Sequence, residues 1–206
     1  MLERLKDNYA FAVIRGKTAE DALEIARHAI VGGIKNIEVT YSTPDASRVI
    51  KTLVDEYSSD DTVVIGAGTV MTTDLAREAI AAGAQFLVSP HFSAEIQTIA
   101  KEADNLYFPG CATATEIVTA MEAGCPIIKL FPGGSLGPGF IKDIHGPIPE
   151  VDLMPSGGVS VENVAAWKAA GACAVGVGSA LSAKVATEGY SSVTAFAKAF
   201  MAAVEG

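Results

Sequence analysis

The sequence predicts an α/β fold in which eight parallel strands close into a (β/α)8 barrel, a TIM barrel. Short apolar runs alternate with helical patterns along the chain, which is typical of parallel strands joined by crossover helices. Eight such units fit into 206 residues, at the small end of the size range of this barrel. A glycine closes the helix before every second expected strand, at Gly33, Gly83, Gly124 and Gly171. This recurrence suits a closed, repeating architecture; an open flavodoxin-like sheet is the alternative, but it needs fewer strands.

The expected strands are short apolar runs, each followed by a polar or glycine-rich turn. They are Phe11–Ile14, Asn36–Thr40, Thr62–Ile65, Phe86–Ser89, Leu106–Phe108, Ile127–Phe131, Asp152–Met154 and Ala174–Val177. Apolar residues at helical spacing predict helices within residues 18–33, 43–57, 72–83, 93–103, 113–124 and 160–171. Thr18 is the expected N-cap of the first of these helices, because threonine can accept a hydrogen bond from the first turn.

Composition favours one globular domain over residues 1–206, because no linker or change of composition divides the chain. The net charge of −9 argues against general binding to nucleic acid or to an anionic membrane, both of which need a basic face. A small anionic ligand remains compatible, since a pocket can be locally positive. No apolar run approaches a membrane span, the first residues lack the apolar core of a signal peptide, and the three cysteines have no metal-type spacing. These features predict a cytoplasmic protein.

Two glycine-rich loops follow the seventh and eighth expected strands, at Gly157-Gly158 and Gly178-Ser179. In barrels of this kind the chemistry collects where strands end, and phosphate sites often lie after strands seven and eight. Glycine lets backbone N–H groups approach an anion closely. Glycines also serve tight turns, but two such loops at these strands together predict a phosphate-binding site.

Lys129 and Glu38 stand as charged residues inside apolar strands. A lysine is seldom fully buried unless it is paired, so these two residues could form a buried ion pair, or the lysine stem could be buried while its amine reaches solvent. The functional alternative is a lysine that forms a Schiff base. Burial disfavours the charged form of an amine and makes it available to attack a ketone, and a nearby carboxylate could shuttle protons through a water molecule.

The order of several motifs resembles the class I aldolases that cleave 2-keto-3-deoxy-6-phosphogluconate (KDPG). The motifs are "IEVT", "GAGTV", "AQFLVSP", "PGCATATE", "IIKLFP", "PSGGVS" and "VGVGSAL", and they extend from Ala12 to Leu181. The resemblance implies a (β/α)8 barrel, usually a homotrimer, that acts in the Entner–Doudoroff route. It would cleave its phosphorylated keto-acid substrate to pyruvate and glyceraldehyde 3-phosphate with no metal and no other cofactor.

The resemblance also assigns roles to residues of this chain. Lys129 in "KLFP" would be the imine-forming lysine, and Glu38 in "EVT" the general acid and base. Thr69 would contact the pyruvate carboxylate, and Ser179 with the two glycine loops would hold the phosphate. The substrate-binding residues expected on this basis are Arg15, Thr69, Pro90, Pro109, Gly110, Phe131, Ser156, Gly157, Gly158, Gly178 and Ser179.

One position departs from the family pattern. Many members carry an arginine two residues after the threonine of "EVT", where this chain has Ser42. Arg15, at the end of the first strand, could supply the missing cation, since a guanidinium can hold a carboxylate with two hydrogen bonds. The substitution affects the expected substrate preference more than the reaction type.

Several functions therefore remain open at this point. The leading hypothesis is KDPG cleavage, and the close alternatives are cleavage of 4-hydroxy-2-oxoglutarate (KHG) or of 2-keto-3-deoxy-6-phosphogalactonate (KDPGal). A non-catalytic phosphosugar-binding barrel is a further alternative. The presence of both Lys129 and Glu38 argues against it, because phosphate binding needs neither residue.

Overall fold

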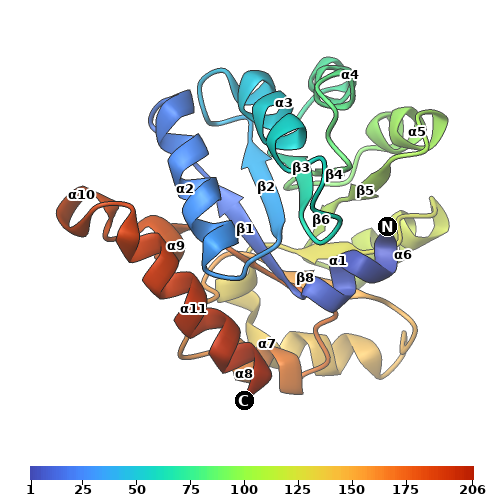
Figure 1. Cartoon of the computed structure of the whole chain (residues 1–206). Coiled ribbons are helices and arrows are strands. Elements are labelled where there is room, and N and C mark those ends of the chain that lie inside the picture. The colour runs from blue at the N-terminus through green and yellow to red at the C-terminus, as the bar shows by residue number, and fades with distance from the viewer.

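Parallel strands surrounded by helices make up the computed structural model, which describes residues 1–206 (Figure 1). The strands are β1 Ala10–Ile14, β2 Asn36–Thr40, β3 Val64–Gly68, β4 Phe86–Val88, β5 Leu106–Phe108, β6 Gly110–Cys111, β7 Ile128–Leu130, β8 Leu153–Pro155 and β9 Val175–Val177. The helices are α1 Leu2–Asn8, α2 Ala19–Val31, α3 Ala46–Glu56, α4 Thr73–Ala81, α5 Ala94–Glu102, α6 Ala114–Glu122, α7 Gly133–His145, α8 Val164–Ala169, α9 Ser179–Ser182, α10 Val185–Glu188 and α11 Ser191–Glu205.

The strands form two parallel sheets. One has six strands in the order β5-β4-β3-β2-β1-β9, and the other has three in the order β6-β7-β8. A single bridge between Ser156 and Gly176 lies between the two sheets, and only Pro109 separates β5 from β6 in the chain. The parallel α/β fold is confirmed, and β1 to β5 lie side by side in chain order, unlike a doubly wound sheet, whose order reverses. One closed sheet of eight strands was expected, whereas the structure has nine strands in two sheets.

The largest difference from the expected boundaries concerns β3. The sequence predicts a strand at Thr62–Ile65, whereas β3 covers Val64–Gly68. Glycine is depleted in strands, so "GAG" reads as a turn. Space explains the glycines: a Cβ at Gly66 would overlap the ring of Phe86, and a Cβ at Gly68 would overlap the carboxylate of Glu38.

The helix ends follow the expected signals. Thr18 accepts a hydrogen bond from the amide of Asp21 and is the N-cap of α2, as predicted. The four recurring glycines all have positive φ, which only glycine adopts without strain. These φ values are 105° at Gly33, 94° at Gly83, 87° at Gly124 and 101° at Gly171. Each glycine therefore turns the chain from a helix into the next strand.

Several helices have no counterpart among those expected. The segment of α7 contains Pro138 and a non-helical Gly137 with φ 75°, and such residues are typical of loops. α11 packs against α2 and α8 on the outside of the strands (Figure 1). No helix of the structure combines the length and the apolar character needed to cross a membrane.

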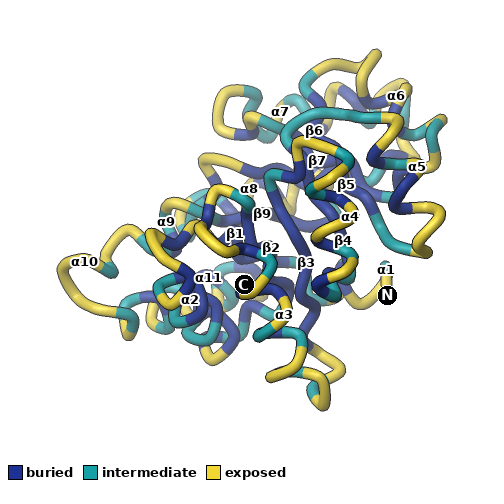
Figure 2. The backbone as a smooth tube through the Cα atoms, turned by 90° about the horizontal axis from the view of Figure 1, so that it is seen from above, coloured by how far each residue is buried: buried dark blue, intermediate teal, exposed yellow.

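Apolar side chains form two clusters, and neighbouring residues along β1, β4 and β5 alternate between them. The larger, outer cluster contains residues such as Ala12 and Ile37, whose side chains face the helices. The interior cluster lies on the other face of the strands; it consists of Leu5, Phe11, Val64, Phe86, Val88, Phe108, Ile127, Met154 and Ala174. Buried residues are concentrated in the strands and exposed residues in the outer turns (Figure 2).

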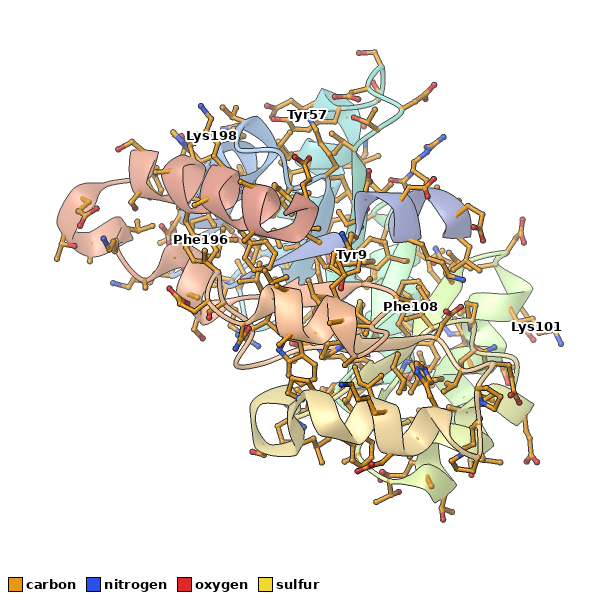
Figure 3. All side chains as sticks on the ribbon, turned by 90° about the horizontal axis from the view of Figure 1, so that it is seen from below. Tyr9, Tyr57, Lys101, Phe108, Phe196 and Lys198 are labelled. Carbon is orange, nitrogen blue, oxygen red and sulfur yellow. The ribbon has the colours of Figure 1, made fainter.

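Helix α1 covers the interior cluster at the beginnings of the strands. Its Leu5 is fully buried within that cluster, and Figure 3 shows α1 across the strands near Phe108. The side chain of Asn36 donates to the carbonyl of Leu5 over 2.9 Å, and Lys6 forms an ion pair with Asp152. The helix therefore closes one end of the strands, and the opposite end carries the residues described next.

Candidate active site

Lys129 and Glu38 meet in the interior of the fold. Lys129 follows Ile127 of the interior cluster by two residues, so the pleat of β7 turns both side chains inward. Glu38 comes from the middle of β2. Lys129 is 5% exposed and Glu38 only 1%, and Lys129 Nζ lies 3.7 Å from Glu38 Oε1. This separation makes an ion pair but exceeds hydrogen-bond length.

The environment of Glu38 favours its neutral form. Burial raises the pKa of Glu38 above its ordinary value, and the positive charges of Lys129 and Arg15 oppose this shift only in part. Neither carboxylate oxygen has a hydrogen-bond partner in the chain. A buried carboxyl group with a raised pKa and free oxygens is suited to give and take protons.

The neighbouring strand β3 makes room for Glu38, and a residue with strained backbone directly follows this strand. In the sheet register Glu38 lies opposite Gly66, and Thr40 lies opposite Gly68. Thr69, the next residue, has a φ of 56°. This left-handed conformation is uncommon for threonine, and strained residues cluster at functional sites. Thr69 therefore directly follows the strand that pairs with β2, and its role at the substrate stays a prediction.

A pocket of about 280 Å³ lies at the carboxyl ends of β1, β8 and β9, and neither Lys129 nor Glu38 lines it. It brings together seven of the predicted site residues. The residues that line it are Val13, Arg15, Phe131, Ser156, Gly157, Gly158, Val159, Ser160, Gly178, Ser179 and Ala180. Arg15 is the only charged residue among them, so the pocket is locally positive although the chain is acidic.

The glycine pair of this pocket has the backbone geometry of an anion site. Gly157 and Gly158 have φ values of 87° and 74°, which a larger residue would adopt only with strain. The amide of Gly158 donates no hydrogen bond within the chain. Gly133 and Gly134 pack closely against this loop from the start of α7. Both predicted glycine loops line this pocket, and one of them has a free backbone donor.

Phe131 connects the pocket to the lysine. Its ring lines the pocket, and Lys129 Nζ lies 5.3 Å from the ring centroid. A cation at this distance is attracted to the face of an aromatic ring. A ligand whose anionic group occupies the pocket could therefore place a reacting atom near Lys129.

Pro109 and Gly110 lie against the backbone of Lys129, and Pro90 packs against Gly110. The Lys129 amide donates to the carbonyl of Pro109 over 2.9 Å, and Gly110 is the register partner of Lys129. A Cβ at Gly110 would overlap the backbone of Pro90. The lack of a side chain at Gly110 lets these two loops pack together. None of the three residues lines the pocket of the glycine loops, and their role at the substrate stays a prediction.

Arg15 and Thr69 are not brought into one pocket, although both were expected at the carboxylate. Arg15 lies next to Gly178 in the pocket of the glycine loops, and Thr69 does not line that pocket. Ser42 is exposed, and its hydroxyl lies 2.7 Å from that of Thr40. The position that is arginine in many aldolases therefore supplies no charge here.

Sequence reasoning missed four residues that line the pocket: Val13, Val159, Ser160 and Ala180. Val13 precedes Arg15 by two residues on β1, so the strand alternation could have placed it on the same face. Val159 and Ser160 are the two residues after Gly158, and Ala180 directly follows Ser179. No group of three or more His, Cys, Asp or Glu side chains is arranged to hold a metal ion.

Known proteins are similar to this chain in sequence and in fold. The family model for KDPG and KHG aldolases matches residues 1–196. A 2-dehydro-3-deoxy-6-phosphogalactonate aldolase of Escherichia coli (strain K12) is 34% identical over 94% of this chain and 95% of its own length. A 2-dehydro-3-deoxy-phosphogluconate aldolase of Treponema pallidum (strain Nichols) is 37% identical over 82% of this chain and 78% of its own.

A solved structure extends the comparison to three dimensions. It is the KDPG aldolase of Legionella pneumophila with pyruvate captured at low pH as a covalent carbinolamine intermediate. The two chains are 28% identical with a TM-score of 0.84, and the alignment covers 96% of each.

Proposed function

Because this chain belongs to the family of KDPG and KHG aldolases, which cleave carbon–carbon bonds, we propose that it cleaves KDPG to pyruvate and glyceraldehyde 3-phosphate through an imine on Lys129. The observation that carries the proposal is the buried pair of Lys129 and Glu38. An amine and a carboxyl group in contact, enclosed by apolar side chains, are the two groups that imine chemistry requires.

The proposed reaction uses each group in turn. The Lys129 amine attacks the C2 ketone, and loss of water gives the imine. Glu38 takes the proton of the C4 hydroxyl, the C3–C4 bond breaks, and the aldehyde leaves while its bonding electrons pass into the enamine. A proton then returns to C3, and water hydrolyses the imine to release pyruvate and the free amine.

We assign the two ends of the substrate to different residues. The loops at Gly157-Gly158 and Gly178-Ser179 would bind the phosphate, with Ser156 and Phe131 completing the wall, and Thr69 would contact the carboxylate. Arg15 is proposed at the carboxylate, but its place in the pocket also suits the phosphate. Arg15→Ala separates these roles: harm to phosphorylated and unphosphorylated keto acids alike indicates the carboxylate, and harm to phosphorylated ones alone indicates the phosphate.

Trapping tests the central assignment. Borohydride added with pyruvate should reduce the imine to a stable secondary amine and inactivate the enzyme. Mass spectrometry should then place the added group on the peptide that contains "IIKLF". Modification of a different lysine, or no modification, would contradict the role of Lys129. Pyruvate has no phosphate, so this test does not depend on the phosphate site.

A second candidate substrate is KDPGal. The Escherichia coli KDPGal aldolase aligns with nearly the full length of both chains, and Ser42 replaces the arginine found in many family members. KHG is a third candidate, since the matching family includes enzymes for both substrates. Initial rates with KDPG, KDPGal and KHG at equal concentrations would rank the three, and the highest kcat/KM would identify the substrate.

We further propose that the two sheets act as one closed barrel in a single domain of residues 1–206, and that the cytoplasmic protein is a homotrimer. The bridge between Ser156 and Gly176 and the single residue between β5 and β6 support closure. The family resemblance supports the trimer. Light scattering during size-exclusion chromatography should give about three times the chain mass of 21.2 kDa.

A further inference from the structure

Two buried threonines of the β2–α3 segment bond to the backbone on both sides of Arg15. Thr40 Oγ1 donates to the carbonyl of Ile14 over 2.8 Å. The amide of Gly16 donates to Thr43 Oγ1 over 3.1 Å. Thr40 is fully buried and Thr43 is 3% exposed. The peptide groups before and after Arg15 are therefore each fixed by one hydroxyl group.

The hydrogen bonds around Thr40 have one consistent direction. A carbonyl oxygen can only accept, so the single hydroxyl proton of Thr40 belongs to the bond with Ile14. The contact of 2.7 Å between the hydroxyls of Thr40 and Ser42 must then have Ser42 as its donor. The Thr43 amide also donates to the Thr40 carbonyl over 2.9 Å, so Thr40, Ser42 and Thr43 form one connected turn.

The Arg15 side chain has no such support of its own. It forms no hydrogen bond and no ion pair within the chain, and it is exposed at the pocket. A long, unpaired side chain takes its direction from the backbone that carries it. The backbone here has little freedom, because a Cβ at Gly16 would also collide with the backbone of Thr18 and Ala22.

We propose that Thr40 and Thr43 are positioning residues that hold the backbone on both sides of Arg15 and so direct its guanidinium group into the pocket. The inference rests on the proposed function, because it needs Arg15 to bind an anionic end of the substrate. A merely structural role would instead have the two hydroxyls join the ends of β1 and β2 with no effect on substrate binding.

The variants Thr43→Val and Thr40→Val remove the hydroxyls and keep the shape of the side chains. Misplacement of a binding group by about 1 Å can cost on the order of a hundredfold in rate. We therefore expect each variant to lower kcat/KM for the preferred substrate by about tenfold to a hundredfold, mainly through KM. Thr43→Ser keeps the hydroxyl and should retain activity within about threefold. Thr119→Val is the matched control, because Thr119 is exposed on α6 and its hydroxyl bonds only to its own helix.

The count of active sites separates positioning from folding. Borohydride trapping of pyruvate counts the molecules with a competent Lys129, and kcat/KM is divided by that number. A structural role predicts a lower melting temperature with an unchanged kcat/KM per competent site, and this result would overturn the proposal. If Thr43→Val does not fold, Thr40→Val and Thr43→Ala provide the same measurement.

A double-mutant cycle with Arg15→Ala tests the route of the effect. Once Arg15 is gone, Thr43→Val should lower kcat/KM by less than about twofold. A full, additive loss would show that Thr43 acts independently of Arg15, which refutes the inference and leaves the aldolase assignment intact. If Arg15→Ala alone leaves kcat/KM unchanged for every keto acid, the proposed role of Arg15 is itself wrong, and this inference fails with it.

Discussion

The two ends of the inward-facing strand surface differ in chemistry. The interior cluster, mostly from the beginnings of the strands, is apolar and aromatic, with Phe11 and Phe86 in edge-to-face contact at 5.3 Å. The carboxyl ends carry a lysine, a glutamate and the glycine loops. The side chains change from apolar to charged over two residues, from Ile127, directly before β7, to Lys129 within it.

This contrast shows how one set of strands serves stability and chemistry. The apolar end lies under α1, where burial stabilises the fold. At the other end, two ionisable groups are held in a buried interior at a cost in desolvation that the apolar layer below helps to offset. Substitutions at the first end should therefore change stability, and those at the second end should change kinetics.

The largest expected effect is at Lys129. Lys129→Met keeps an unbranched side chain but removes the nucleophile, so turnover should fall by at least about 10⁴-fold, and borohydride should trap no pyruvate. Steady-state assays and mass spectrometry measure both results. Lys142→Met, on the exposed part of α7, serves as the control. Substantial residual turnover in Lys129→Met would locate the chemistry elsewhere.

Glu38 comes next. Glu38→Gln keeps the size of the side chain but removes its proton transfer, so kcat should fall by about 10²- to 10⁴-fold, the usual contribution of general acid–base catalysis. Stopped-assay kinetics at saturating substrate give kcat. A near-normal kcat would assign the acid–base role to another group.

The anion pocket should show a smaller, substrate-dependent effect. Ser179→Asp places a negative charge against the phosphate, so kcat/KM for phosphorylated substrates should fall by about a hundredfold, or ~3 kcal/mol. Binding energy from a remote phosphate acts in the transition state, so kcat as well as KM can change. KHG, which lacks a phosphate, is the internal control. Equal losses with both substrates would contradict a phosphate site.

The apolar end provides the opposite case. Ile127→Val removes one methylene group from the interior cluster and should lower the free energy of unfolding by about 0.5–1.5 kcal/mol. Denaturant titration measures this change, and kcat/KM per folded molecule should stay within about twofold. A marked kinetic loss would mean that the two ends are more strongly coupled than their chemistry indicates.

The smallest effect concerns pH. Burial raises the pKa of Glu38. As the pH falls, activity that needs the ionised form of Glu38 should therefore begin to decline at a pH above the ordinary glutamate pKa of about 4.3. The charge of Arg15 lowers this pKa, so Arg15→Ala should raise it and move the acid limb of the kcat/KM profile to higher pH. The variant has no Arg15 charge for salt to screen, so added salt should leave the acid limb of its pH profile nearly unmoved. An unchanged or lower limb would contradict the electrostatic link between Arg15 and Glu38.

Much of the fold was predictable because each of its signals is local. The strand order and the helix-closing glycines follow from alternation and from turn chemistry, as at Thr18 and Gly33. The boundaries of β3 were not predictable, because Gly66 and Gly68 belong to the strand only on account of Phe86 and Glu38, which are distant in sequence. The division of the strands into two sheets likewise depends on long-range pairing.

The candidate site divides in the same way. Lysine and glutamate inside apolar strands, and glycines after the last strands, are visible in the sequence, and the structure brings these residues close together. The location of Arg15 beside Gly178 and the bond from Gly16 to Thr43 are not visible, since they join segments 27 residues or more apart. Such contacts become apparent only when the loops are seen in space.

The pairing of β1 with β9 has a consequence for how the protein is made. β1 and α1 leave the ribosome early, yet their partners include β9 and Asp152, which are synthesised much later. One edge of β1 and the Lys6 side of α1 therefore lack their partners until most of the chain has emerged. Contacts between such distant segments slow folding, so the nascent chain should be most vulnerable to aggregation shortly before its last strand is complete.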